Sequence, residues 1–196
     1  MNKYTSLIVV AAFATSCSSS LAPLRKDGLK PTVVTETVLH DTDDPAIWIH
    51  PTNPQESLVI GTDKDTDGGL YVFNLQGKII KKSETIKRPN NVDIAYGLQI
   101  DGVLTDIAVT TERETNKIRI FSLPDLKPLD NGGIPVFEGE LERDPMGIAI
   151  YTRPSDKAVF AIVGRKSGPS GSYLWQYELK GTSNAKVEAT WVRKFG

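Results

Sequence analysis

The sequence predicts an all-β protein made of a repeated four-stranded sheet, and three observations support this fold class. From Thr35 onward, apolar residues do not recur at the spacing of an amphipathic helix. They occur in short runs separated by Gly, Pro, Asn and Asp, which are the residues that favour turns. These runs also recur with a period of about fifty residues, which indicates a repeat architecture.

Each repeat begins with a polar pair that leads into a short apolar strand, and the repeats start at Asp44, Asn91 and Asp144. Two further apolar runs follow in every repeat, and a fourth run closes the first and the third. The predicted strands are 43–50, 58–62, 69–75 and 77–82 in the first repeat, 90–97, 106–111 and 117–123 in the second, and 143–151, 158–164, 173–179 and 186–195 in the third.

Four antiparallel strands in about 40–50 residues are typical of one blade of a β-propeller, whose innermost strand lines a central channel. The sequence predicts three such blades, at about 38–88, 89–140 and 141–196. A closed propeller needs about 4–8 blades, so we expect a fragment or a truncated product that forms part of a ring. Assembly of two half-rings and an open sandwich are the alternatives.

The first residues have the order of a secretory signal. The apolar run 6–14 is too short to span a bilayer, and Cys17 follows where such a signal is cut. The segment resembles a bacterial lipoprotein signal. We therefore expect a signal peptide at 1–17, a lipid on Cys17 and a flexible tether at 18–34. Plain cleavage and a buried free thiol are the alternatives.

This N-terminal segment predicts a location in the bacterial cell envelope. The protein would be lipid-anchored, or else periplasmic or extracellular, and the lipid would be its only contact with the membrane. The 196 residues are 39% apolar and 24% charged, as in soluble globular proteins, and the formal net charge is -1. Basic residues are scattered and create no field that would attract a nucleic acid, so we expect no such partner.

The segment TDKDTDGGLYVF, residues 62–73, places acids at every second position before a glycine pair. An EF-hand calcium loop would need a bidentate Glu at its twelfth position and a helix on either side. The twelfth residue from Asp63 is Asn74, and the flanking runs are apolar and partly β-branched, as in strands. We therefore expect a turn between two strands, in which Lys64 matters more than the acids beside it.

A basic residue follows the second predicted strand of each repeat, at Lys64, Arg113 and Arg165. These positions are 49 and 52 residues apart, close to the repeat period. Equivalent positions of successive blades lie side by side around one end of a propeller, so we expect the three cations to converge. Such a cluster would suit a polyanion, because Arg binds phosphate oxygens bidentately and Lys is a movable point charge. Charged turns that share a phase by chance are the alternative.

The repeats contain three distinctive segments, DTDDPAIWIHPTNP, PNNVDIAYG and GTDKDTDGGLYVFNLQGK. Together these segments resemble the β-propeller phytases, calcium-dependent enzymes that remove phosphate from myo-inositol hexakisphosphate. The resemblance runs from about Val38 to Gly196, and it implies that 35–196 is the first half of a six-bladed propeller. It also implies Ca²⁺ as cofactor, an inositol phosphate or another phosphorylated small molecule as ligand, and the missing half-propeller as partner.

The resemblance implies two roles for acidic residues of the first blade. Asp44, together with the main-chain carbonyls of Pro45 and Val92, matches a structural calcium site between blades. Asp43 matches an acid beside the calcium ions of the active site, where we expect it to serve catalysis. Calcium takes about 6–8 oxygen ligands, so carboxylates suit it. Metal-bound water is a better nucleophile for attack at phosphorus.

The resemblance also implies that the cations hold substrate. Lys64 and Arg113 match residues that bind substrate phosphate, and either Arg165 or its neighbour Lys166 matches a third. Cations at these positions would stabilise the charge that develops on the phosphate oxygens. In DPMGIAIY, Met146 stands where the family carries a phosphate-binding Tyr, and a thioether is only a weak acceptor.

The later blades of the family supply further acidic calcium ligands, so we expect this chain alone to have impaired activity. Two other functions stay open: a non-catalytic binding module at the cell surface, and a calcium-dependent hydrolase of another ester, such as a lactone. Trp48, Trp175 and Trp191 each lie in an alternating strand, which favours packing between blades over carbohydrate stacking. His40 and His50 receive no role.

Overall fold

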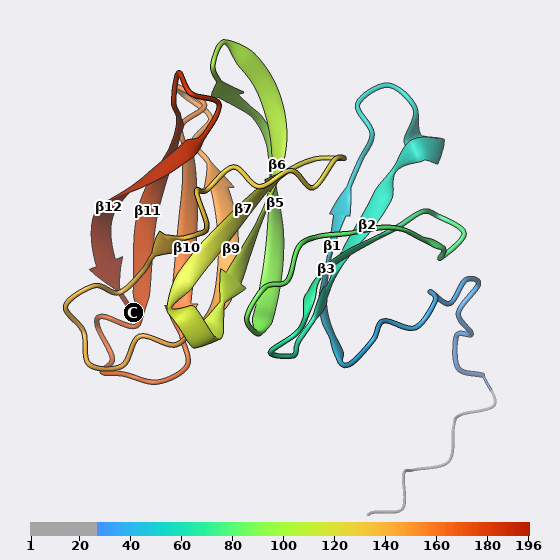
Figure 1. Cartoon of the computed structure of the whole chain (residues 1–196), viewed down its shortest axis with the longest axis horizontal. Helices are drawn as coiled ribbons and strands as arrows, with labels where there is room; N and C mark the ends of the chain where they lie inside the picture. The colour runs from blue at the N-terminus through green and yellow to red at the C-terminus, as the bar shows by residue number, and fades with distance from the viewer. Residues whose placement is uncertain (1–26) are drawn as a thin grey trace, which may run out of the picture. The chain divides into compact units, whose positions relative to one another are not determined.

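The computed structural model describes residues 27–196, which contain three four-stranded sheets (Figure 1). The predicted signal peptide, Cys17 and most of the predicted tether lie outside the described residues. The chain divides into two compact units, Met1–Thr32 and Val33–Gly196, and every described strand belongs to the second. No helix in the described part is long and apolar enough to cross a membrane.

Each sheet is an antiparallel meander in which the strands pair in chain order. The sheets confirm the predicted all-β propeller blades. The first sheet consists of β1 (Thr42–Trp48), β2 (Leu58–Asp63), β3 (Gly69–Phe73) and β4 (Ile79–Lys82). The second consists of β5 (Pro89–Ile100), β6 (Val103–Glu112), β7 (Lys117–Ser122) and β8 (Ile134–Pro135). The third consists of β9 (Pro145–Thr152), β10 (Val159–Arg165), β11 (Leu174–Gly181) and β12 (Val187–Phe195).

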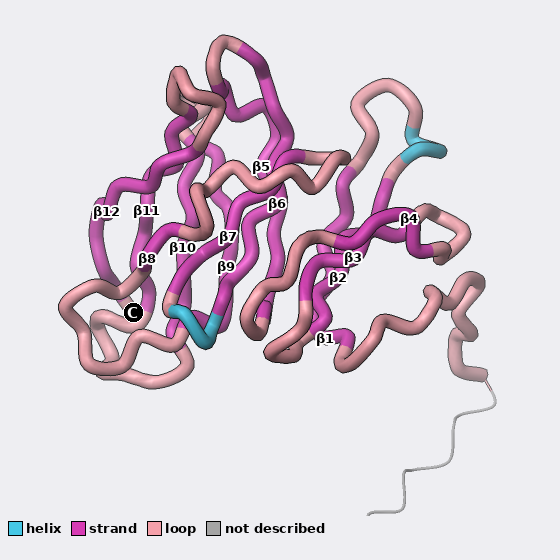
Figure 2. The backbone as a smooth tube through the Cα atoms, viewed as in Figure 1, coloured by secondary structure: helices cyan, strands magenta, loops and turns pink. Residues whose placement is uncertain are grey.

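The connections are turns and loops, with two short 3₁₀ turns that are coloured cyan in Figure 2. One is η1 (Pro54–Glu56), and the other is η2 (Arg113–Thr115), which directly follows β6. The segment from Asp63 to Gly69 is a tight turn between β2 and β3, as predicted, and strands flank it on both sides. Asp65 organises this turn, because its carboxylate accepts from the Asp67 N–H and its carbonyl accepts from the Gly68 N–H.

The first strands of the three sheets pack against one another, β1 on β5 and β5 on β9. An aspartate joins each pair of neighbouring sheets at this inner edge. The Asp44 carboxylate accepts from the Val92 N–H at 2.9 Å, and the Asp93 carboxylate accepts from the Ile150 N–H at 2.7 Å. Hydrogen bonds between a charged group and the backbone are among the stronger ones, so the two aspartates fix the position of each sheet on the next.

Two apolar clusters fill the spaces between the sheets. One lies between the first and second sheets and includes Ile60, Val72 and Ala108, and the other lies between the second and third and includes Val109 and Val163. The alternation of β-strands explains this arrangement, since Ala108 and Val109 are neighbours on β6 and point to opposite faces. Burial of these side chains is the main stabilisation of the stack.

The three tryptophans do not share one environment. Trp48 is only 4% exposed and donates its indole N–H to Asp106 at 2.8 Å, and Trp175 is also buried, so the packing prediction is confirmed for both. The prediction is wrong for Trp191, which is 51% exposed. Trp191 lies on the last strand of its sheet, where β12 has no further strand beside it.

Candidate functional site

The turns that carry the predicted cations of the first and second sheets are joined by the backbone of Arg88. The Arg88 N–H donates to the carbonyl of Asp65 at 3.0 Å, and its carbonyl accepts from the Arg113 N–H at 3.2 Å. A side-chain bond of 2.7 Å from Thr66 to Glu114 reinforces this junction. The Lys64 turn and the Arg113 turn therefore lie together, as the repeat predicts.

The first strand of each sheet pairs irregularly at this same end. The register with the second strand shifts between Thr42 and Pro45, between Pro89 and Val92, and opposite the stretch from Val163 to Arg165. Such bulges re-aim side chains and are common beside active sites. The shifts fall on the DDP, PNNV and DP segments that the sequence singles out.

Lys64 and Asp43 form the central ion pair of this site. The Lys64 Nζ lies 2.8 Å from Asp43 Oδ1 and 3.4 Å from Asp41 Oδ2. The hydrogen bond with Asp43 raises the pKa of Lys64, so this ammonium stays charged. The other Asp43 oxygen accepts from the Asn90 side-chain amide at 3.2 Å. Asp43 thus links a cation of the first sheet to the first strand of the second.

Asp44 has a free position for a cation. One of its carboxylate oxygens holds the Val92 N–H, and the Asp44 N–H donates to Thr62 Oγ1 at 3.0 Å. The second carboxylate oxygen has no hydrogen bond among the described residues. Pro45 follows Asp44 in the chain and Val92 is its hydrogen-bond partner, so the carbonyls of both residues belong to this part of the site. A carboxylate with main-chain carbonyls is a donor set that calcium accepts, although the set supplies fewer oxygens than calcium takes.

Asp63 is a further acid at this end, and the sequence analysis assigned it only to the turn. It is completely buried, and one oxygen accepts from the N–H groups of His40 and Asp41 at 3.1 and 2.8 Å. Its other oxygen is buried without a partner in the described structure, as is the side-chain oxygen of Asn90. Asp63 ends the apolar run of β2 on the face opposite Ile60, and the segment of His40 and Asp41 covers that face. Only its place at the end of an apolar strand was a signal in the sequence.

Arg113 begins η2, and its guanidinium makes no ion pair or hydrogen bond with the described residues. Arg88 is a second half-buried cation at this end of the sheets, and its backbone lies between the Lys64 turn and the Arg113 turn. It has a φ of 61°, a conformation that a long side chain rarely adopts. Arg88 was not predicted, because it stands directly before PNNVD and outside the repeat phase that Lys64 and Arg113 share.

Arg165 does not join these cations. Its side chain is 1% exposed and donates to Glu140, to the Glu142 carbonyl and to Ser172 over 2.7–3.1 Å. Gly168 lies against this guanidinium so closely that a Cβ there would be 2.4 Å from the Arg165 Nε. The expectation that Arg165 faces a ligand is therefore not met, because the fold uses its charge internally.

Lys166 is exposed and makes no side-chain ion pair with the described residues, so of the two candidates it is the one that remains available. Its N–H donates to the Asp144 carbonyl at 2.8 Å, which holds it beside the start of β9. The neighbouring Met146 carbonyl accepts from Thr111 at 3.0 Å, which ties this segment to the end of β6. The third turn therefore lies at the same end as the other two, with Lys166 as its outward cation.

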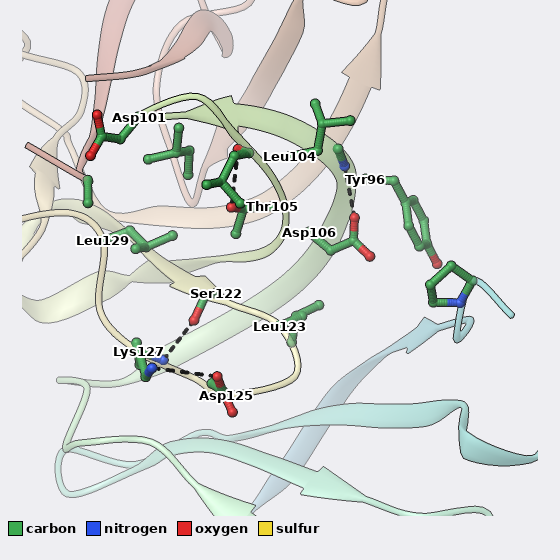
Figure 3. Close-up of a pocket in the computed structure, with 15 residues that line it drawn as sticks. Tyr96, Asp101, Leu104, Thr105, Asp106, Ser122, Leu123, Asp125, Lys127 and Leu129 are labelled. Atoms are coloured by element: carbon green, nitrogen blue, oxygen red, sulfur yellow. Dashed lines mark hydrogen bonds and ion pairs between the residues drawn. The ribbon is translucent and has the colours of Figure 1, made fainter. Parts of the chain in front are cut away.

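A large cavity lies at the opposite end of the second sheet, around the hairpin from β5 to β6 (Figure 3). It has a volume of about 860 Å³. Asp106 lines it, but both carboxylate oxygens are used, by the Gly97 N–H and the Trp48 indole. Asp125 is paired with Lys127 at 3.7 Å. The carboxylates of this cavity would repel a phosphate, and its cation Lys127 lies beside Asp125. In the described part no three His, Cys, Asp or Glu side chains form a metal site.

Comparisons with known proteins give one family. A sequence model of the family described as Phytase matches residues 3–196. A 3-phytase of Bacillus subtilis (strain 168) is 31% identical over 159 residues, which cover 78% of this chain and 39% of that protein. The chain thus spans about two-fifths of the length of this relative.

A search by fold finds hydrazine synthase of Kuenenia stuttgartiensis, with a TM-score of 0.35 and 11% identity. The match covers 79% of this chain and 56% of the other. A similarity this low supports no conclusion about function.

Proposed function

This chain belongs to the phytase family, and we propose that it binds inositol phosphates at the end of the sheets where Lys64 and Arg113 lie. We further propose that, with calcium and the remainder of a propeller, this site hydrolyses phosphomonoesters such as phytate. The B. subtilis relative is named a 3-phytase, which supports this substrate class. The observation that carries the proposal is Asp43, which joins Lys64 to Asn90 across the junction of the first two sheets.

The residues present fit calcium only in part. Asp43 and Asp44 would hold it, with the carbonyls of Pro45 and Val92. Bound calcium would neutralise phosphate charge and lower the pKa of a coordinated water. The buried, unpartnered oxygens of Asp63 and Asn90 show that this end keeps oxygen acceptors without donors, which is compatible with a cation nearby.

Lys64 would bind and orient the phosphate. Its ammonium has three donors, and it can exchange Asp43 for a phosphate oxygen once that carboxylate is taken up as a ligand. Arg113 brings a planar guanidinium that is not committed to any described side chain, and it would neutralise charge on the oxygens of the reacting group. Lys166 and Arg88 would hold neighbouring phosphates of a polyphosphorylated ring.

Calorimetric titration of the chain with myo-inositol hexakisphosphate tests binding. We expect Arg113→Met to weaken the affinity by about tenfold, roughly 1.4 kcal/mol, through loss of a charge-assisted contact. Lys157→Met is the matched control, because Lys157 is an exposed cation in the turn between β9 and β10, at the other end of the third sheet. Equal affinity for Arg113→Met and the native chain would refute the proposed site.

Catalysis is tested separately by release of phosphate from phytate with calcium and with a chelator. A second candidate function, a binding module without catalysis, is favoured because no three acidic, His or Cys side chains of the described residues come together as a metal site. Binding without release from a chain extended to the length of its relative would support that candidate. Hydrolysis of a lactone in place of phytate would support a hydrolase of another ester.

The predicted lipid anchor is a separate proposal. We propose that Cys17 is acylated and holds the protein at the cell envelope. Radiolabelled palmitate should enter the native chain and not Cys17→Ala. Label in Cys17→Ala would contradict the anchor and leave the phosphate site unaffected.

A further inference from the structure

An aromatic groove lies between the second and third sheets, and none of its lining residues belongs to the proposed phosphate site. Trp175 and Tyr177 of β11 and Trp191 of β12 form its wall, and Glu138, Glu140 and Lys194 supply polar groups. Its volume is about 430 Å³, within the range of small-molecule sites, which are mostly apolar with a few placed polar groups. The groove opens beside β8, so it does not depend on any blade that would follow the third.

The wall is built by the register of the third sheet. Tyr177 pairs with Trp191 and Trp175 pairs with Lys194, so the three rings gather on one face of β11 and β12. The Trp175 and Trp191 rings are 5.8 Å apart at an angle of 56°. Trp175 is buried and Tyr177 is held by the Phe137 N–H at 2.8 Å, so both have fixed positions. Trp191 alone presents a large apolar face to solvent.

The charged side chains at the groove have a net charge close to zero. Glu140 is bonded to Arg165 at 3.1 Å and to Lys194 at 3.2 Å, and these two cations lower the pKa of Glu140. Glu138 is exposed and adds one negative charge. The two carboxylates are thus balanced by two cations.

These charges decide the class of ligand. The Lys194 ammonium already lies 5.7 Å from the centre of the Trp175 ring, where an organic cation would otherwise bind. The carboxylates of Glu138 and Glu140 would repel a phosphate. A neutral ligand with an apolar face and many hydroxyl groups meets neither obstacle, because carboxylates accept from hydroxyls and the ammonium donates to them.

We propose that the aromatic groove binds neutral carbohydrate, with a pyranose ring stacked on Trp191. The C–H face of the sugar would cover the exposed indole, and its hydroxyls would bond to Glu138 and Lys194. Stacking of this kind places a ligand without a change in the backbone, since β11 and β12 fix the rings. The site would bring the protein to a polysaccharide, independently of phosphate chemistry.

Titration of the chain with cellohexaose, xylohexaose and maltohexaose tests this inference, with calorimetry as the measurement. We expect at least one of them to bind with a dissociation constant of about 0.1–1 mM, as for a single stacked contact. Trp191→Ala should weaken that binding by tenfold or more. Trp191→Tyr, which keeps an aromatic ring, should stay within threefold of the native chain.

Val192→Ala is the matched control, because Val192 is also half-exposed and adjacent on β12 but is not among the residues that line the groove. Lys64→Met should bind the oligosaccharide as the native chain does, so the two sites are distinguishable. No binding of any of the three hexaoses would overturn the inference. Binding that survives in Trp191→Ala, or saturable binding of tetramethylammonium in their place, would overturn it as well.

Discussion

Lys64 and Arg165 stand at equivalent phases of the repeat, at the ends of the second strands of the first and third sheets, and they have opposite environments. Lys64 is partly exposed and pairs with Asp43 at the rim, whereas Arg165 is enclosed by Glu140, Glu142 and Ser172. Counting residues between repeats locates the cation of each turn to within one position. In a strand, a shift of one position moves a side chain from one face of the sheet to the other, so the count does not decide whether the cation is buried or exposed.

The difference arises from where the second strand ends. β2 ends at Asp63, whose side chain is turned inward, and Lys64 lies beyond the strand. β10 extends through Arg165, which shares a face with the buried Val163, so Lys166 is the residue that points outward. The first and third blades therefore place the cation of this turn on different sides, outward as Lys64 and inward as Arg165.

Replacement of the enclosed cation should have the largest effect on stability. Arg165→Met keeps much of the volume but leaves Ser172 and the Glu142 carbonyl without their donor. Since Glu140 retains Lys194, we expect a loss near the low end of the range for broken buried pairs, about 3 kcal/mol. Urea unfolding with an unchanged m-value is the measurement. A loss below about 0.5 kcal/mol would show that the enclosure of Arg165 is not energetically important.

Replacement of the exposed cation should change binding and not stability. We expect Lys64→Met to lower the affinity for myo-inositol hexakisphosphate by about tenfold, because a charged phosphate contact is lost. The free energy of unfolding should change by less than about 1 kcal/mol, as for other surface ion pairs. If Lys64→Met instead lost stability and kept the native affinity, Lys64 would be a structural cation like Arg165, and the two turns would not differ in role.

Lys166→Ala gives a smaller effect of the same kind. The Lys166 side chain is exposed and less constrained than that of Lys64, so we expect the affinity for myo-inositol hexakisphosphate to fall about threefold. This loss is well under the roughly 1.4 kcal/mol that corresponds to a tenfold change. The free energy of unfolding should match that of the native chain. Native affinity in Lys166→Ala would restrict the phosphate site to the first two sheets.

The smallest expected effect is a difference between the native chain and Glu140→Gln in how stability falls at acid pH. The hydrogen bond from Arg165, assisted by Lys194, lowers the pKa of Glu140 below its ordinary value of 4.5. A lowered folded-state pKa contributes stability that is complete above pH 4.5 and is lost as the pH falls through the folded value. Unfolding measured at successive pH values below 4.5 should therefore show a shallower decline for Glu140→Gln than for the native chain. Identical slopes would mean that the pair does not contribute to acid stability.

Most of the fold was predictable because its signals are local. Alternation and turn residues located eleven of the strands, and the repeat gave the order of the sheets. The strand β8 was missed, since Ile134–Pro135 is too short to show any alternation. The inward Arg119 was also missed. Burial opposes its charge, but the hydrogen bonds that Arg119 donates to Asp130 and Glu84 outweigh burial and raise the pKa of Arg119. Both partners lie in loops, outside the alternating pattern of the strands.

The candidate site was predictable in its location more than in its contacts. The repeat placed Lys64 and Arg113 at neighbouring turns, and the structure joins these turns through Arg88. That junction depends on a backbone conformation with positive φ, for which Arg gives no sequence signal. The roles of the calcium ligands and of the phosphate-binding cations stay predictions.

The brevity of β8 has a consequence for the evolution of this surface. β8 pairs with only the first two residues of β7, whereas β12 runs for nine residues beside β11. Pro135 of β8 and the exposed Trp191 line the same groove, so the length of β8 helps to set how open that groove is. If the groove binds carbohydrate as proposed, the length of this one connection would tune that binding without touching the residues of the phosphate site.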